Sequence, residues 1–143
     1  MLYITAIFSA VLALMFVKLS FRVIELREFQ KEVLENGEVG ALDRAIRAHA
    51  NFTEYVPMGL MLMGVLELNG APWVSVAIVG TFSVLGRYFH AQGMRDDVHD
   101  FANRIAGMKF TLVGLALSAL ANIVWVGYVL IASARFATSV YAN

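Results

Sequence analysis

Residues 44–57 have the sequence RAIRAHANFTEYVP, a dense polar cluster that leads directly into a long apolar segment. Charged side chains at membrane depth are costly, at roughly 2.5–3.5 kcal/mol for an Arg or Asp at the centre of a spanning helix. Several such groups on one helix therefore indicate a functional role. On a 3.6-residue helix, part of the cluster falls within an arc of about 100°. The residues of this polar arc are Arg44, Arg47, Asn51, Glu54 and Tyr55.

The side chains of the polar arc suit a small ligand that carries carboxylates and an amine. Arg47 offers a fixed fork of donors, Asn51 both a donor and an acceptor, and Glu54 a carboxylate for an ammonium group. An internal ion pair from Arg47 or Arg44 to Glu54 is the structural alternative. His49 points to the opposite side of the helix, so it could serve the same pocket only from a different subunit.

The composition points to a membrane protein. The chain has 143 residues, of which 59% are hydrophobic, and a mean hydropathy of +0.69. This is too apolar for a soluble domain of that size. The formal net charge is zero, so nothing suggests a nucleic-acid partner. Cysteine is absent, which excludes disulfides, thiolate metal sites and a protein thiol nucleophile, and the histidines do not form a metal-ligand pattern.

Apolar segments of membrane-spanning length occur at residues 1–22, 41–68, 72–94 and 107–134. They predict an all-α, integral membrane four-helix bundle in a single domain, with helices at about 1–35, 41–68, 72–94 and 104–134. No basic residue precedes the uncharged stretch from Leu2 to Val17. This favours a retained first membrane helix over the alternative of a cleaved signal peptide.

Positive charges flank the first and third connections between these segments. They are Lys18, Arg22, Arg27, Lys31, Arg44 and Arg47 around the first, and Arg87, Arg95, Arg104 and Lys109 around the third. Residues 69–72 carry none, and only Arg135 follows the fourth segment. The positive-inside rule therefore predicts that both charged connections face the cytoplasm and both termini lie outside.

Two further constellations lie at the same predicted membrane face. Arg87 and His90 are spaced i and i+3 and share one helix face. They could line a pocket, with His90 as a proton carrier, or anchor the helix at the interface beside Tyr88. Arg104 stands at the start of the fourth helix, where a guanidinium and the helix dipole would favour a thiolate. A plain positive-inside charge is the alternative for Arg104.

Small residues on the fourth segment predict a close helix contact. Such residues let membrane helices approach one another, either within a subunit or in a dimer. We expect the intramolecular use. The small residues are Gly107, Gly114, Ser118 and Ala121.

The spacing Arg44-x-x-Arg47-Ala-His49-x-Asn51-x-x-Glu54-Tyr55-x-Pro57 resembles the signature of the MAPEG family, the membrane-associated proteins in eicosanoid and glutathione metabolism. The stretch 86–93 and the pair Asn103-Arg104 agree with it, and the bacterial branch is the most similar. The resemblance covers nearly the whole chain. It implies a homotrimer of four-helix subunits that binds glutathione as co-substrate between neighbouring subunits, at the cytoplasmic side.

The resemblance also implies roles for individual residues. Arg47, Asn51, Glu54 and Tyr55 would hold the glutathione of their own subunit's site, and Arg87 and His90 would line it. His49 and Arg27 would reach the site next door. Arg104 would stabilise the glutathione thiolate. His90 and Met94 stand where the leukotriene branch has two tyrosines, and this difference argues against eicosanoid substrates in this pocket.

The function expected from these observations is that of a glutathione-dependent membrane transferase or peroxidase for lipophilic electrophiles, in detoxification. Its thiolate would rest on Arg104 at a subunit interface, in a bacterial inner membrane. A non-catalytic trimeric membrane scaffold or small-molecule binding protein is the alternative. An ion pathway along the trimer axis would require the ionisable faces to point at that axis.

Overall fold

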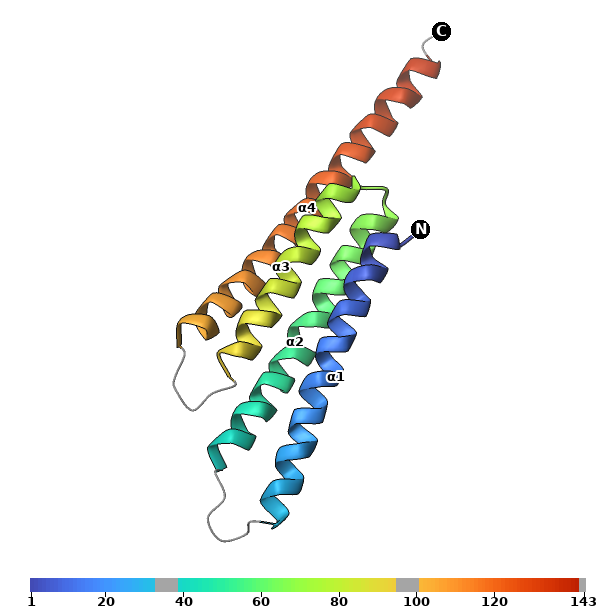
Figure 1. Ribbon diagram of the computed structural model, residues 1–143. Helices are drawn as coiled ribbons and strands as arrows, with labels where there is room; N and C mark the ends of the chain where they lie inside the picture. Colours follow the sequence, from blue (N-terminus) through green and yellow to red (C-terminus); the bar gives the residue numbers. More distant parts are fainter. Residues whose placement is uncertain (33–38, 95–100, 142–143) are drawn as a thin grey trace.

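The computed structural model describes residues 1–32, 39–94 and 101–141. These residues form α1 (Tyr3–Glu32), α2 (Val39–Leu68), α3 (Trp73–Gln92) and α4 (Phe101–Tyr141). The prediction of an all-α fold is thus confirmed. Figure 1 shows an elongated bundle in which α1 runs beside α2 and α3 beside α4, with both termini toward the same end.

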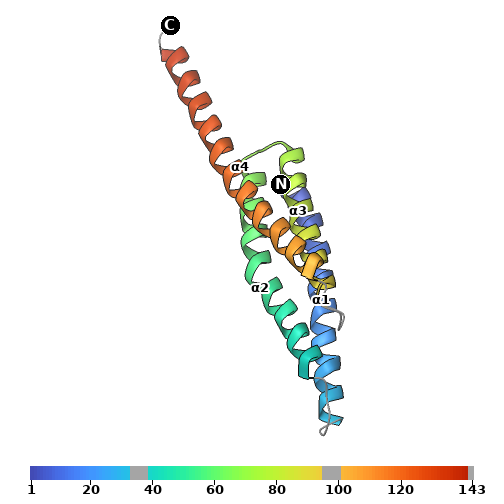
Figure 2. The same ribbon diagram turned by 90° about the vertical axis from the view of Figure 1, so that its left-hand side faces the viewer.

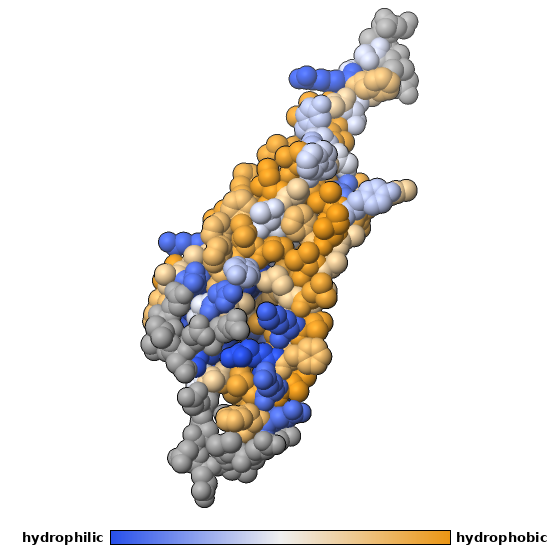
Figure 3. All heavy atoms as spheres, viewed as in Figure 1, coloured by the Kyte–Doolittle hydropathy of each residue, from blue (hydrophilic) through white to orange (hydrophobic). Residues whose placement is uncertain are grey.

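Three helices are long and apolar enough to cross a membrane within the described part of the chain. The spans are Tyr3–Phe29, Trp73–Gln92 and Phe101–Ser139. The sequence predicted four spans; α2 does not qualify on its own, because its first half carries the polar arc. It nevertheless packs against all three of the other helices. Figure 3 shows hydrophobic side chains over the middle of the molecule and hydrophilic ones gathered toward one end, as expected of an integral membrane protein.

The apolar core lies toward the end of the bundle that holds the turn between α2 and α3. Met63, Leu66, Val76 and Val79 are buried together there. At the same end, the Glu67 carboxylate accepts hydrogen bonds from the backbone N–H groups of Ile4 (2.9 Å) and Thr5 (2.7 Å). Amides in the first turn of a helix lack intrahelical partners, so Glu67 caps α1 and ties it to α2. The core and this cap therefore lie at one end of the bundle, and the polar arc of α2 lies toward the opposite end.

Close approach of α3 and α4 depends on glycine. A Cβ on Gly107 would lie 2.3 Å from the backbone nitrogen of His90, which no neighbouring backbone can accommodate without moving. Gly114 packs against Phe82, and Ser118 is fully buried. The small residues of α4 therefore pack within the subunit, which confirms the intramolecular interpretation.

The boundaries of α4 differ from the sequence prediction. The helix begins at Phe101 and continues to Tyr141, beyond residue 134. No Gly or Pro interrupts residues 128–141, so nothing in the chain stops the helix there. In Figures 1 and 2 this part of α4 projects past the other three helices. The predicted end of the first helix, at about residue 35, lies outside the described residues.

Candidate functional site

The Arg87 side chain joins three helices inside the bundle. Arg87 is only 2% exposed. From α3, its Nη1 donates to the backbone oxygen (3.1 Å) and to Oδ1 (2.6 Å) of Asn51 on α2. Its Nη2 donates to the Thr111 hydroxyl on α4, which in turn donates to the Gly107 carbonyl at 2.8 Å. The interpretation of Arg87 as a snorkelling anchor is therefore wrong, because the guanidinium finds its partners in the protein interior.

Tyr55 completes the surroundings of this guanidinium. The Cζ atom of Arg87 lies 5.5 Å from the centre of the Tyr55 ring, a cation–π distance. Asn51 and Tyr55 are one turn apart on α2, so both turn the same edge of the polar arc toward α3. The structure thus brings together three of the predicted site residues.

The contact with Arg87 fixes the orientation of the Asn51 amide. A guanidinium has donors and no acceptor, so only the carbonyl oxygen of Asn51 can face it. The Nδ2 group of Asn51 must then point away from Arg87. Asn51 is half-buried, so part of the residue is reachable from outside the bundle.

Arg47 and Glu54 form the outer edge of the polar arc and are both exposed. The Arg47 Nε donates to Asp43 Oδ2 at 2.8 Å, one turn earlier on α2. Their side chains remain 64% and 57% exposed, so this pair is accessible to competing ligands. Within the described residues, no ion pair joins Arg47 to Glu54, so this one of the two internal pairs considered from the sequence is not formed. Arg44, also in the arc, is half-buried.

His49 lies on the opposite side of α2 and faces α1, as its helical position predicted. Its Nε2 is 3.2 Å from the Ser20 hydroxyl oxygen, and its ring centre is 4.8 Å from that of Phe16. His49 and the exposed Arg27 line one shallow hollow between α1 and α2. The two residues expected to reach a neighbouring site therefore share one surface, on the far side of α2 from Asn51.

Arg104 lies in the first turn of α4 and is exposed. A Cβ on Gly93 would lie 2.5 Å from the Arg104 backbone nitrogen, so the end of α3 touches the start of α4. His90, 6% exposed, is buried at the same helix pair. In the described part of the chain, Arg104 makes no ion pair. Its guanidinium is thus available at the end of the bundle where the polar residues gather.

Thr111 is the residue of this site that sequence reasoning missed. A threonine in an apolar helix is unremarkable by itself. Its one signal is its place one turn after Gly107, on the small-residue face of α4 that packs against α3. No group of three metal-ligating side chains occurs among residues 1–32, 39–94 and 101–141.

Comparison with known proteins identifies the family. The profile of the MAPEG family matches residues 5–138. The chain belongs to the MAPEG family. This MAPEG protein is 34% identical over 132 residues to inner membrane protein YecN of Escherichia coli strain K12, which covers 92% of this chain and 99% of YecN. YecN of Escherichia coli O6:H1 strain CFT073 matches to the same extent. The resemblance inferred from residues 44–57 is thereby confirmed, and the match includes every predicted site residue.

Proposed function

We propose that the protein is a glutathione-dependent membrane enzyme, a transferase or peroxidase acting on lipophilic electrophiles. The observation that carries this proposal is the division of the polar arc of α2. Arg87 holds its inner edge through Asn51 Oδ1, so the Asn51 Nδ2 donor points away from Arg87. Arg47 and Glu54 are exposed. Glutathione carries two carboxylates, an ammonium group and two peptide units. A guanidinium, an amide donor and a carboxylate on one surface complement those groups.

The same arrangement supports a site between subunits of a homotrimer. In a cyclic assembly, each subunit presents one face to the next subunit and a different face to the previous one. The polar arc and the surface of His49 and Arg27 lie on opposite sides of α2. Arg27 and His49 of one subunit would then approach the glutathione held by Arg47, Asn51, Glu54 and Tyr55 of its neighbour.

In the proposed reaction, Arg104 stabilises the glutathione thiolate. Its guanidinium and the start of α4 together favour a negative charge. In transfer, the thiolate sulfur attacks an electrophilic carbon, a C–S bond forms, and the leaving group departs with its electron pair. In the peroxidase reaction, two glutathiones become a disulfide while a hydroperoxide is reduced to an alcohol and water. Neither route needs a protein nucleophile, so a chain without cysteine suffices.

We place the site at the cytoplasmic face of a bacterial inner membrane, with both termini outside. The name of the relative, inner membrane protein YecN, supports the compartment. The orientation rests on the positive charges at the ends of α1 and α3 and the starts of α2 and α4. A lipophilic substrate would reach the site from the bilayer.

Thermal unfolding of the detergent-purified protein with glutathione tests the proposal. A ligand at about 100 times its Kd stabilises the native state by roughly 2.7 kcal/mol, so the melting temperature should rise clearly. Arg47→Gln should reduce this rise, whereas Arg135→Gln, at the far end of α4, should not. Conjugation of glutathione to a nitro-activated aryl chloride then tests catalysis. Trimers that show no shift with glutathione would support the non-catalytic scaffold instead.

A further inference from the structure

A second candidate binding site lies between α1 and α3. The groove has a volume of about 560 Å³, within the range of small-molecule sites. Ala45 and Ala48 of α2 also line it. None of the residues assigned to glutathione lines this groove, and Met94 is the one lining residue at a position that the family resemblance places near the glutathione pocket.

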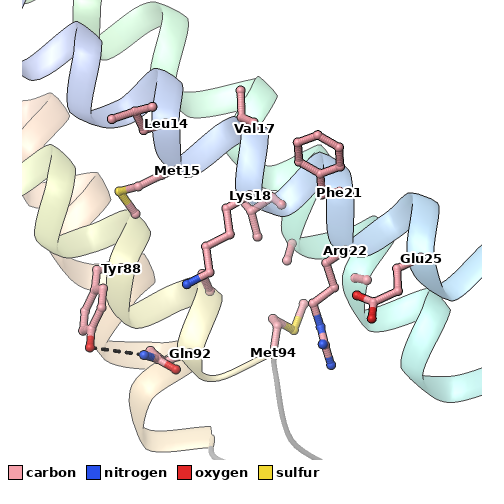
Figure 4. A pocket seen from close by; sticks show the side chains of 14 residues that line it. Leu14, Met15, Val17, Lys18, Phe21, Arg22, Glu25, Tyr88, Gln92 and Met94 are labelled. Carbon is pink, nitrogen blue, oxygen red and sulfur yellow. Dashed lines mark hydrogen bonds between the residues drawn. The ribbon is translucent and has the colours of Figure 1, made fainter.

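The groove is cationic at one end. Lys18 and Arg22, one turn apart on α1, both line it. Figure 4 shows the Lys18 ammonium directed toward α3 and the Arg22 guanidinium directed toward Met94, just past the end of α3. Like charges at this spacing repel each other. Glu25 is the carboxylate lining the groove, but within the described residues no ion pair joins it to Lys18 or Arg22. Two cations and one carboxylate leave this end with an excess of positive charge that an anion would neutralise.

Tyr88 adds a hydrogen-bond donor on the opposite wall. Its hydroxyl oxygen accepts a hydrogen bond from Gln92 Nε2 at 3.1 Å, one turn later on α3. The hydroxyl proton of Tyr88 therefore remains free to donate to a ligand. Figure 4 shows Tyr88 and Gln92 across the groove from Lys18.

The other end of the groove is apolar. Leu14, Met15 and Val17 line it, and they precede Lys18 along α1 toward the middle of the bundle. Leu14 and Arg22 are separated by about 12 Å along the helix axis at 1.5 Å per residue. An apolar stretch that ends in two cations suits a molecule with one hydrocarbon chain and one anionic head.

We propose that this groove binds a single-chain anionic lipid. The head lies between Lys18 and Arg22, and the chain runs along Leu14 and Met15. The size of the groove fits one chain better than the two chains of a diacyl phospholipid. The site goes beyond the glutathione-dependent function and does not depend on it.

The experiment compares two lipids with the same chain on the full-length protein in nonionic detergent. Lauroyl lysophosphatidylglycerol is anionic, whereas lauroyl lysophosphatidylcholine is zwitterionic. Native mass spectrometry and the melting temperature report binding. We expect the anionic lipid to bind about tenfold more tightly, equivalent to about 1.4 kcal/mol. Glycerol phosphate, which lacks the chain, should not bind.

Variants locate the site. Lys18→Gln combined with Arg22→Gln should weaken binding of the anionic lipid about tenfold, while glutathione still raises the melting temperature. Lys109→Gln, an exposed cation on α4 outside the groove, is the matched control and should change nothing. Ala91→Trp, on the α3 wall, should block the chain and reduce binding of both lipids. If that variant fails to fold, the double variant decides, because Lys18 and Arg22 are exposed and not needed for packing.

Several results would overturn the proposal. These are no binding of either lipid, equal binding of both, binding of glycerol phosphate alone, or an effect of Lys109→Gln as large as that of the double variant. Equal loss of glutathione stabilisation in the double variant would also overturn the separation of the two sites.

Discussion

Arg87 donates a 2.6 Å hydrogen bond to Oδ1 of Asn51, a residue 36 positions earlier in the chain. Because the guanidinium cannot accept, this contact determines which end of the Asn51 amide faces outward. Arg87 is therefore a positioning residue, which acts on a ligand through Asn51. The same contact holds α2 against α3. Different substitutions of Asn51 can therefore separate the stability of the protein from its affinity for glutathione.

Replacing Asn51 by Asp should affect binding and not stability. The new carboxylate can still accept from Arg87, but the outward Nδ2 donor is lost. We expect glutathione affinity to fall about tenfold, a change of about 1.4 kcal/mol, with the melting temperature unchanged or higher. Asn51→Leu removes the side-chain acceptor as well and should lower the free energy of unfolding by about 1–3 kcal/mol. Calorimetric titration measures glutathione affinity, and thermal unfolding measures stability, for both variants. An Asn51→Leu protein as stable as the original would contradict the bridging role of Arg87.

The sequence predicted that the polar arc and His49 lie on opposite sides of α2, because this follows from helical geometry alone. A period of 3.6 residues places Asn51 and His49 on opposite sides, and the contacts with Arg87 and Ser20 agree. It did not predict the burial of Arg87. Its partners lie on two other helices, 36 and 24 residues away, and nothing in a local pattern specifies which helices meet.

Gly107→Ala should destabilise the protein because α3 and α4 are in backbone contact there. The added methyl would lie 2.3 Å from the His90 nitrogen, so one helix must move. Overpacking of this kind costs about 1–3 kcal/mol. Gly127→Ala is the matched control, since nothing lies within 4 Å of its added Cβ. Melting temperatures measured in one detergent compare them, and equal values for the two variants would refute the close contact.

Glu67→Ala should loosen the start of α1. It removes both acceptors for the N–H groups of Ile4 and Thr5, and loss of a helix cap costs about 0.5–2 kcal/mol. Hydrogen exchange followed by mass spectrometry should show faster exchange in the first turn of α1, with little change in α4. Glu28→Ala, an exposed carboxylate on α1, serves as control. Unchanged protection at Ile4 and Thr5 would mean that the cap is not formed in the membrane protein.

The capping role of Glu67 also shows a limit of sequence reasoning. A carboxylate near the end of an apolar helix looks like an interfacial charge, and its partners are 63 and 62 residues away. The ends of α4 differ from prediction for another reason. Hydropathy falls before the helix stops, and residues 128–141 contain no Gly or Pro, so the helix can continue past its apolar span.

Asp43→Asn should strengthen glutathione binding slightly. Asp43 holds the Arg47 guanidinium in an exposed i,i+4 pair, and such pairs contribute about 0.3–0.5 kcal/mol. Without the Asp43 carboxylate to compete for Arg47, the affinity for glutathione should rise about twofold, which corresponds to about 0.4 kcal/mol. Arg47→Gln should act in the opposite direction, by about tenfold. Titration calorimetry at low salt measures both; equal changes of one sign would exclude Arg47 as the group that binds the ligand carboxylate.

The ultraviolet absorbance of the glutathione thiolate, measured on the assembled protein near neutral pH, tests the proposed chemistry most directly. Stabilisation by Arg104 predicts a thiolate band when glutathione is added. The band should fall in Arg104→Ala, because loss of the guanidinium should raise the pKa of the bound thiol by about one unit, and it should persist in Lys109→Ala. An Arg104→Ala protein that remains assembled, binds glutathione and shows the full thiolate absorbance would contradict the role of Arg104.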